Sequence, residues 1–130
     1  MILDASAIIA MLRAEPEAHD FAEAMVSAGS RRVSAVNYVE AAAVIESRRD
    51  PVASRRFDDF FRSSRVTIEA VTERQAQMAR QAYRDFGKGR HKAGLNLGDC
   101  FAYALAKDLD EPLLFKGNDF KHTDIEAAEY

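Results

Sequence analysis

Four acidic residues, Asp4, Glu40, Asp99 and Asp119, stand at positions where a carboxylate needs an explanation. Each follows an apolar run typical of a buried strand or lies among the apolar residues of an expected helix. Carboxylates that a fold brings together repel one another, and a divalent cation relieves that repulsion. Mg2+ or Mn2+ suits a set of oxygen ligands. The four residues therefore predict a metal-binding acid cluster, which is typical of a nuclease.

Glu40 is the acid that a structural role explains least well. It shares one helical stripe with Val36, Val39, Ala43 and Val44, so the spacing predicts a carboxylate in an apolar face. A buried carboxylate must pair with a cation, coordinate a metal or take up a proton. An ion pair with an arginine is the structural alternative to a metal.

The other three acids also have structural alternatives. Asp4 directly follows an expected strand and can cap the next helix, and Asp99 follows Asn96 at capping-box distance. Asp119 lies in a segment, 116–120, whose composition is common in turns. Taken together, the four acids favour a shared site more strongly than each does alone, because the expected topology puts all of them at one end of a sheet.

The elements that must position these acids alternate between strand and helix. We expect strands at 1–3, 32–35, 66–71 and 113–115, and helices at 5–13, 16–28, 36–49, from 51 onward, 72–87 and 97–109, with a loop at 87–95. Such alternation predicts an α/β fold with a parallel sheet covered on both faces. Ligands then bind at the carboxyl ends of the strands, near a switch in strand order.

Length and composition restrict the classes of protein. The 130 residues suit one domain, 1–130, and the net charge of -3 argues against a general polyanion binder. The single cysteine, Cys100, allows no intrachain disulfide framework and favours a reducing compartment, so we expect the cytoplasm. Asp4 interrupts the apolar N-terminal stretch and Arg13 ends it, so we expect no membrane segment.

The residues around the acids resemble the motifs of PIN-domain ribonucleases, and more closely those of the VapC-type toxins of type II toxin–antitoxin systems. The resemblance covers essentially the whole chain and is carried by four segments, Ile2–Ala7, Asn37–Glu40, Leu97–Ala104 and Gly117–Phe120. It implies a three-layer α/β/α PIN-like domain with a central parallel sheet of four to five strands. The implied activity is Mg2+-dependent endoribonuclease cleavage by metal-activated water, with Mn2+ as a substitute and tRNA or rRNA as the expected substrate.

The resemblance also implies roles for single residues and partners. Asp4, Glu40 and Asp99 are the implied catalytic and metal-binding acids, with Asp119 as the fourth. Asn118 adjoins Asp119, which leaves open which of the two side chains reaches the metal, and Asp119 is favoured. The implied partners are a homodimeric second copy and a cognate VapB-type antitoxin that inhibits the toxin.

Basic residues near the third motif are candidates for contact with RNA. Lys88, Arg90 and Lys92 lie in a glycine-containing loop, with Arg80 and Arg84 on the helix before it. They can guide a phosphate backbone, and the alternative is an ordinary solvated loop. Ser6, next to Asp4, is a further candidate that can orient a metal, a water molecule or the RNA. His19, His91 and His122 are expected at the solvated surface, and Phe57, Phe60 and Phe61 in the core or in a groove for a partner helix rather than stacked on bases.

Two other functions compete with a nuclease. A phosphoacceptor receiver domain is also doubly wound and acidic, but it requires adjacent acids after the first strand, where this chain has only Ala5 and Ser6 beyond Asp4. A PIN-like binding module that has lost catalysis would keep the same acids, so only a measurement of cleavage with metal separates it from an enzyme.

Overall fold

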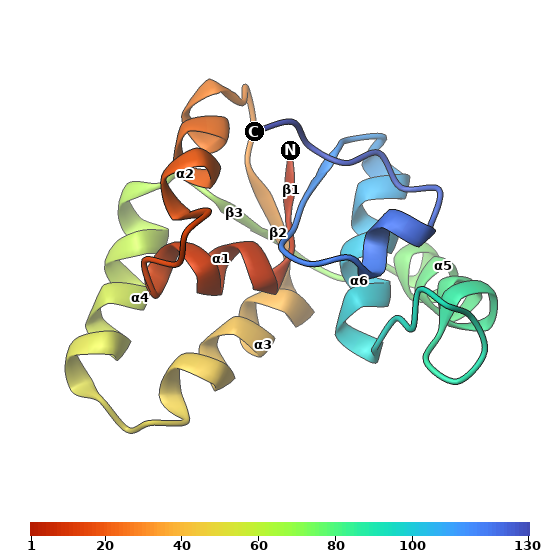
Figure 1. Cartoon of the computed structure of the whole chain (residues 1–130), viewed down its shortest axis with the longest axis horizontal. Coiled ribbons are helices and arrows are strands. Elements are labelled where there is room, and N and C mark those ends of the chain that lie inside the picture. The colour runs from red at the N-terminus through yellow and green to blue at the C-terminus, as the bar shows by residue number, and fades with distance from the viewer.

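A parallel sheet with helices on both faces forms the centre of the protein (Figure 1). The computed structural model describes residues 1–130. In chain order the elements are β1 (Ile2–Leu3), α1 (Ala5–Leu12), α2 (Ala18–Ser27), β2 (Arg32–Ser34), α3 (Ala35–Glu46), α4 (Pro51–Ser63), β3 (Thr67–Glu69), α5 (Glu73–Phe86), α6 (Leu97–Leu109), β4 (Leu113–Leu114) and a 3-10 helix η1 (Asp119–His122). The predicted α/β architecture is confirmed, with four strands.

The strand order places the first strand at a switch point. The order is β3-β2-β1-β4, and every neighbouring pair is parallel. The chain moves outward from β1 through β2 to β3, then returns to add β4 on the other side of β1. In open α/β sheets the crevice at such a reversal, beyond the carboxyl ends of the strands, is where ligands bind. Asp4 is the residue that follows β1.

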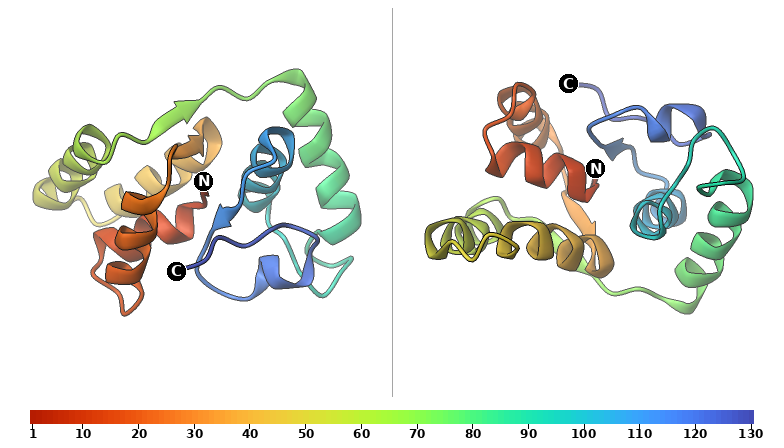
Figure 2. Two further views of the ribbon diagram at one scale, coloured as in Figure 1. Left: turned by 90° about the horizontal axis from the view of Figure 1, so that it is seen from above. Right: turned by 60° about the horizontal axis from the view of Figure 1, so that its bottom comes forward.

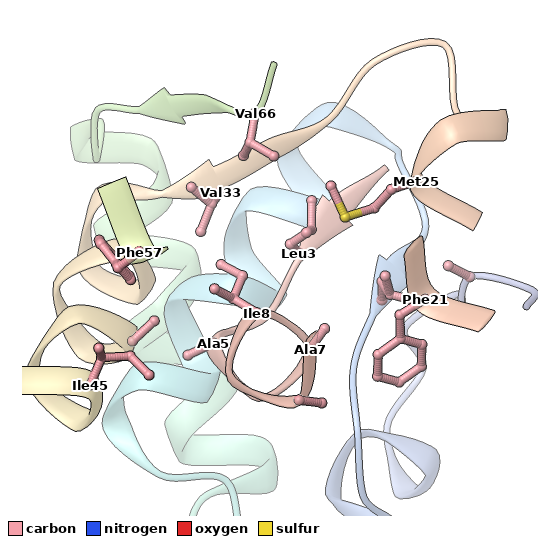
Figure 3. Packing of buried hydrophobic residues seen from close by; sticks show 14 residues of the cluster. Leu3, Ala5, Ala7, Ile8, Phe21, Met25, Val33, Ile45, Phe57 and Val66 are labelled. Carbon is pink, nitrogen blue, oxygen red and sulfur yellow. The ribbon is translucent and has the colours of Figure 1, made fainter. Parts of the chain in front are cut away.

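The two faces of the sheet bury two separate apolar cores. Ile2 and Leu113 belong to a core shared with α5 and α6, whereas Leu3 and Leu114 belong to a core shared with α1 to α4. Successive residues of a strand point to opposite faces, so strands covered on both sides read as continuous apolar runs. Figure 3 shows the second core, in which Leu3 lies near Val33.

The apolar stripe expected around Glu40 is not the buried face of α3. The buried residues of that helix are Asn37, Ala41 and Ile45, and Val39 is 62% exposed. The buried set is one position away from the predicted one: Ala41 and Ile45 belong to the core shared with α1 and α4, and Asn37 contacts α6. Glu40 therefore lies half-buried at the boundary between the packed side of α3 and solvent.

The aromatic residues of α4 pack inside the protein. Phe57 is buried and Phe60 and Phe61 are half-buried against the same core. The ring centroid of Tyr38 on α3 lies 4.9 Å from that of Phe61 and 5.3 Å from that of Phe57. The expectation of a core role is confirmed.

The basic loop between α5 and α6 is tied down at both ends. Gly87 and Leu95 form a parallel bridge, and the Lys88 amide donates to the Leu95 carbonyl at 2.9 Å. His91 is half-buried, and its Nδ1 accepts a hydrogen bond from the Ala93 amide at 3.0 Å. The expectation that His91 is merely solvated is wrong, because this bond makes it part of the loop's framework. No helix of the protein combines the length and the apolar composition that crossing a membrane requires.

Candidate active site

The four predicted acids come from four different elements around the carboxyl end of β1. Asp4 follows β1, Glu40 lies in α3, Asp99 in the first turn of α6, and Asp119 opens η1 after β4. Their charges act on one another: Glu40 raises the pKa of Asp4, Asp99 raises that of Glu40, and Asp4 and Asp119 raise that of Asp99. The fold thus brings together four carboxylates that are up to 115 residues apart in the chain (119 − 4).

Asp4 caps a helix with one oxygen and leaves the other without a partner. Its Oδ2 accepts hydrogen bonds from the Ser6 amide at 3.0 Å and from the Ser6 hydroxyl at 2.6 Å, at the start of α1. Its Oδ1 is buried and has no hydrogen-bond partner. Burial raises the pKa of Asp4 above its ordinary value, despite the hydrogen bonds from Ser6 that lower it. The capping role and a ligand role are therefore compatible.

Ser6 links Asp4 to Lys116, two residues after β4. The Ser6 hydroxyl donates to Asp4 and accepts a hydrogen bond from the Lys116 amide at 3.0 Å. With its single proton committed to the carboxylate, the hydroxyl fixes the rotamer of Asp4. Ser6 thus acts on Asp4, which agrees with an orienting role.

Glu40 has no basic partner. None of the ion pairs in the protein includes it, so the arginine alternative is wrong. Its Oε1 accepts only a long hydrogen bond, 3.4 Å, from the Asn37 side-chain amide. Burial raises the pKa of Glu40, and the charge of Asp99 raises it further. A half-buried carboxylate with one weak donor is a group that gains from a nearby cation.

Asp99 combines the predicted capping box with an unusual pKa. Its Oδ2 accepts a hydrogen bond from the Asn96 amide at 2.9 Å, which closes the first turn of α6. Burial and the charge of Asp4 raise the pKa of Asp99 to about 6, although the bond from Asn96 lowers it. Ionisation of Asp99 beside the other acids therefore carries an energetic cost.

Asp119 is the most exposed of the four acids. It begins η1, with Asn118 as the capping residue before it, and both side chains are exposed. Asp119 contributes to the raised pKa of Asp99, so the charge of its carboxylate acts on the cluster. As the side chains lie, no group of three or more His, Cys, Asp or Glu residues is arranged to hold a metal ion. Repulsion among unneutralised carboxylates favours such a spread arrangement.

Two residues of the site, Asn37 and Gly98, lie within the motif segments, but the sequence analysis gives neither of them a role. The buried Asn37 side chain donates to the Gly98 carbonyl at 2.9 Å and to Glu40, so it ties α3 to α6 behind the acids. Gly98 leaves room for Glu40, because a Cβ built there would lie 2.0 Å from Glu40 Oε2. An amide and a glycine carry no charge that marks them, and only their position one turn before Glu40 and directly before Asp99 is a signal.

The basic residues predicted to contact RNA lie beside the Asp99 turn. Lys88, Arg90 and Lys92 are exposed on the loop that precedes α6. Arg90, together with Arg80 and Arg84 of α5, lines a groove that also reaches Leu97 in the first turn of α6. The loop and α5 therefore bring positive charge to a groove at the first turn of α6.

Known proteins match this chain over nearly its full length. Residues 1–126 match the family model described as PIN domain. The chain is 54% identical over 129 residues to "Ribonuclease VapC28" of Mycobacterium tuberculosis, covering 98% of this chain and 97% of the relative. It is 47% identical over 128 residues to "Ribonuclease VapC" of Mycolicibacterium smegmatis, covering 98% and 99%.

Solved structures share the fold at low sequence identity. The crystal structure of Mycobacterium tuberculosis VapC20, described as a sarcin–ricin loop cleaving toxin, gives a TM-score of 0.73 at 18% identity and covers 95% of each chain. A toxin–antitoxin complex from Klebsiella pneumoniae gives a TM-score of 0.71 at 15% identity, covering 95% of this chain and 92% of the other. These two likenesses concern the fold alone.

Proposed function

This chain belongs to the PIN-domain family, among its VapC ribonucleases, and on that basis we propose that Asp4, Glu40, Asp99 and Asp119 carry its hydrolysis of RNA with a divalent cation. Mg2+ is the proposed physiological ion, with Mn2+ as a substitute, because the donors are all carboxylate oxygens. The proposed biological role is that of a toxin that cuts cellular RNA. The family membership gives no support to the receiver-domain alternative.

The observation that carries the proposal is the unpartnered oxygen of Asp4. A buried carboxylate oxygen without a hydrogen bond is costly unless a cation compensates it. Glu40 lacks a basic partner as well, and the pKa of Asp99 is raised by burial and by its acidic neighbours. Three carboxylates whose charges act on one another, none of them paired with an arginine or lysine, fit a divalent cation.

The acids and the residues that hold them would have different roles in the reaction. A bound divalent cation supplies Lewis-acid chemistry, polarising the phosphodiester and lowering the pKa of a water molecule. Asp4, held by Ser6, and Asp99, held by the capping box, would bind it with oriented carboxylates. Asn37 holds Glu40 against α6, and Asp119 adds negative charge from the exposed side. No serine, cysteine or histidine nucleophile is required.

The same membership supports proposals for the substrate, the partners and the location. We propose structured cellular RNA, tRNA or rRNA, as the substrate and a VapB-type antitoxin as the inhibitor, and we place both in the cytoplasm. The Klebsiella pneumoniae neighbour is itself a toxin–antitoxin complex. A homodimer is also proposed, supported by the apolar surface of α3 next to Glu40, where Val39 is 62% exposed.

The test is cleavage of cellular RNA by the purified chain, freed of any antitoxin. We expect Mg2+ or Mn2+ to support cleavage, EDTA to abolish it, and Asp4→Asn and Asp99→Asn to abolish it with metal present. Asp58→Asn, a change of an exposed acid on α4, is the matched control and should cleave as the wild type does. Mapping of the new RNA ends identifies the substrate.

Two results would refute the assignment. Cleavage that survives both aspartate changes would show that other groups carry the reaction. A well-folded protein that binds Mn2+ but cuts no RNA under any of these conditions would be a PIN-like binding module without catalysis.

A further inference from the structure

A groove of about 530 Å³ lies between α5, the basic loop and the start of α6. Its floor is apolar: Tyr83 is 38% exposed, Leu97 is 69% exposed, and Phe101 is half-buried. Figure 2 shows α5 on the outer side of α6, with the loop joining them at one end. Side chains of this size left open to water are unusual unless something covers them.

Three arginines, Arg80, Arg84 and Arg90, line the same groove, and none of them forms an ion pair. By contrast, Arg32, Arg62 and Arg74 each pair with an acid. The groove therefore carries unneutralised positive charge in a chain whose net charge is -3. Arginine binds phosphate through a planar fork of donors and also stacks on flat rings. The complementary ligand is an anion with a flat apolar part.

The groove and the acid cluster share the first turn of α6. Leu97 lines the groove, and Asp99 is two residues further along the same first turn of α6. A strand whose phosphate lies at the acids can thus reach the groove with a neighbouring nucleotide. The volume falls in the range of sites that hold small-molecule-sized groups, roughly 300 to 1,000 Å³.

We infer that this groove binds one unpaired nucleotide of the RNA next to the scissile phosphate. The base lies against Tyr83, Leu97 and Phe101, and the phosphates on either side meet Arg80, Arg84 and Arg90. Only an unpaired base can present its face to the apolar floor, because a duplex stacks that face inside. The inference rests on the proposed function and adds to it the residues that hold the nucleotide beside the cleaved bond.

The experiment measures binding without cleavage. Fluorescence anisotropy in EDTA follows a labelled single-stranded oligoribonucleotide of about 12 nucleotides, the upper range of common single-strand sites, and a duplex of the same length. For Arg80→Gln with Arg84→Gln we expect at least tenfold weaker single-strand binding. The slope of log K against log salt should fall by about 1.4, since each lost phosphate contact contributes about 0.7 for single strands.

The base contact is tested separately from the charge. Tyr83→Ala should weaken single-strand binding about tenfold, in the range typical of one lost base stack, while leaving duplex binding unchanged. Tyr83→Phe keeps the ring and should bind as the wild type does. Arg55→Gln with Arg56→Gln removes the same charge from α4, on the opposite side of the molecule, and should have little effect (Figure 1).

Three outcomes would overturn the inference. Equal losses for the α5 and α4 pairs would show general electrostatic attraction, and equal losses for duplex and single strand would exclude a base site. Unchanged RNA binding with an altered oligomeric state, or with weaker binding of an antitoxin, would assign the groove to a protein partner. Because cleavage is absent from the assay, failure of the proposed hydrolysis would leave these results intact.

Discussion

Gly98 is the residue on which the position of Glu40 depends most directly. The Glu40 carboxylate occupies the space that any side chain at position 98 would need, with Oε2 2.0 Å from the ideal Cβ position. The group displaced would be the flexible end of a glutamate and not the backbone. A substitution there should therefore disturb the site much more than the fold.

We predict that Gly98→Ala lowers kcat/KM for RNA cleavage roughly tenfold or more, because a shift of about 1 Å in a catalytic group is enough for such a loss. The melting temperature should change little, because alanine favours a helix over glycine by about 1 kcal/mol, which offsets the cost of displacing the Glu40 side chain. Glu40→Gln provides the reference. Adding Gly98→Ala to it should cost little further activity, as expected when two residues act through one group. Full activity of Gly98→Ala would contradict the prediction.

At the scale of single residues, the sequence identifies the ionisable groups of the site but not the neutral residues that hold them in position. The four acids can be found because a carboxylate after a strand or among apolar residues is an anomaly. Asn37 and Gly98 act through a contact between α3 and α6 that joins residues 61 positions apart. No local pattern encodes such a contact, so the role of these two residues depends on the folded arrangement.

Among the elements, α6 ends in a strained conformation. Asp110, its C-terminal capping residue, adopts φ 52° and ψ 48°, the left-handed region that favours glycine. Asp110 is also exposed, and its negative charge lies at the end of the helix where the macrodipole is already negative. Both effects destabilise the folded protein slightly.

We predict that Asp110→Gly raises the free energy of unfolding by about 0.5 to 1 kcal/mol, by relieving the strain and removing the charge. Asp110→Ala removes only the charge and should gain less. Chemical denaturation measures both, and RNA cleavage should stay unchanged because the residue lies at the far end of α6 from Asp99. A larger gain for alanine than for glycine would contradict the strain argument.

The elements themselves were predictable where periodicity and burial coincide. Strands such as β1 and β4 are covered on both faces, so their apolar runs are unambiguous. The buried face of α3 was not predictable, because two sets of apolar residues share helical spacing and only packing against α1 and α4 selects Ala41 and Ile45. The exposed alternative includes Val39, which is 62% exposed.

For the whole molecule, the acid cluster makes stability depend on pH and on metal. Asp4, Glu40 and Asp99 all have pKa values above their ordinary ones, with that of Asp99 raised from 3.8 to about 6. Such groups bind protons more tightly in the folded than in the unfolded state. For Asp99 the resulting stabilisation is complete below about pH 3.8 and is lost as the pH rises through about 6.

We therefore predict that in EDTA the melting temperature falls as the pH rises from about 5 to about 7.5. Acids with lowered pKa values, such as Glu111 and Asp124, lose their contribution only at lower pH and do not oppose this trend. Asp99→Asn keeps an oxygen to cap α6 but cannot ionise, so it should be more stable than the wild type at about pH 7.5 and should flatten the profile. A wild-type melting temperature that rises across this range would contradict the prediction.

Divalent cations should reverse the loss at neutral pH. An ion that binds only the folded protein stabilises it by about 2.7 kcal/mol at one hundred times its dissociation constant. Addition of Mn2+ at about pH 7.5 should thus raise the melting temperature of the wild type and have little effect at about pH 5, where protons compete for the carboxylates. Asp4→Asn and Asp99→Asn should lose most of the response, whereas Asp58→Asn should keep it. An equal response in all four proteins would mean that the ion binds away from the cluster. The acids would then destabilise the folded protein without binding a metal.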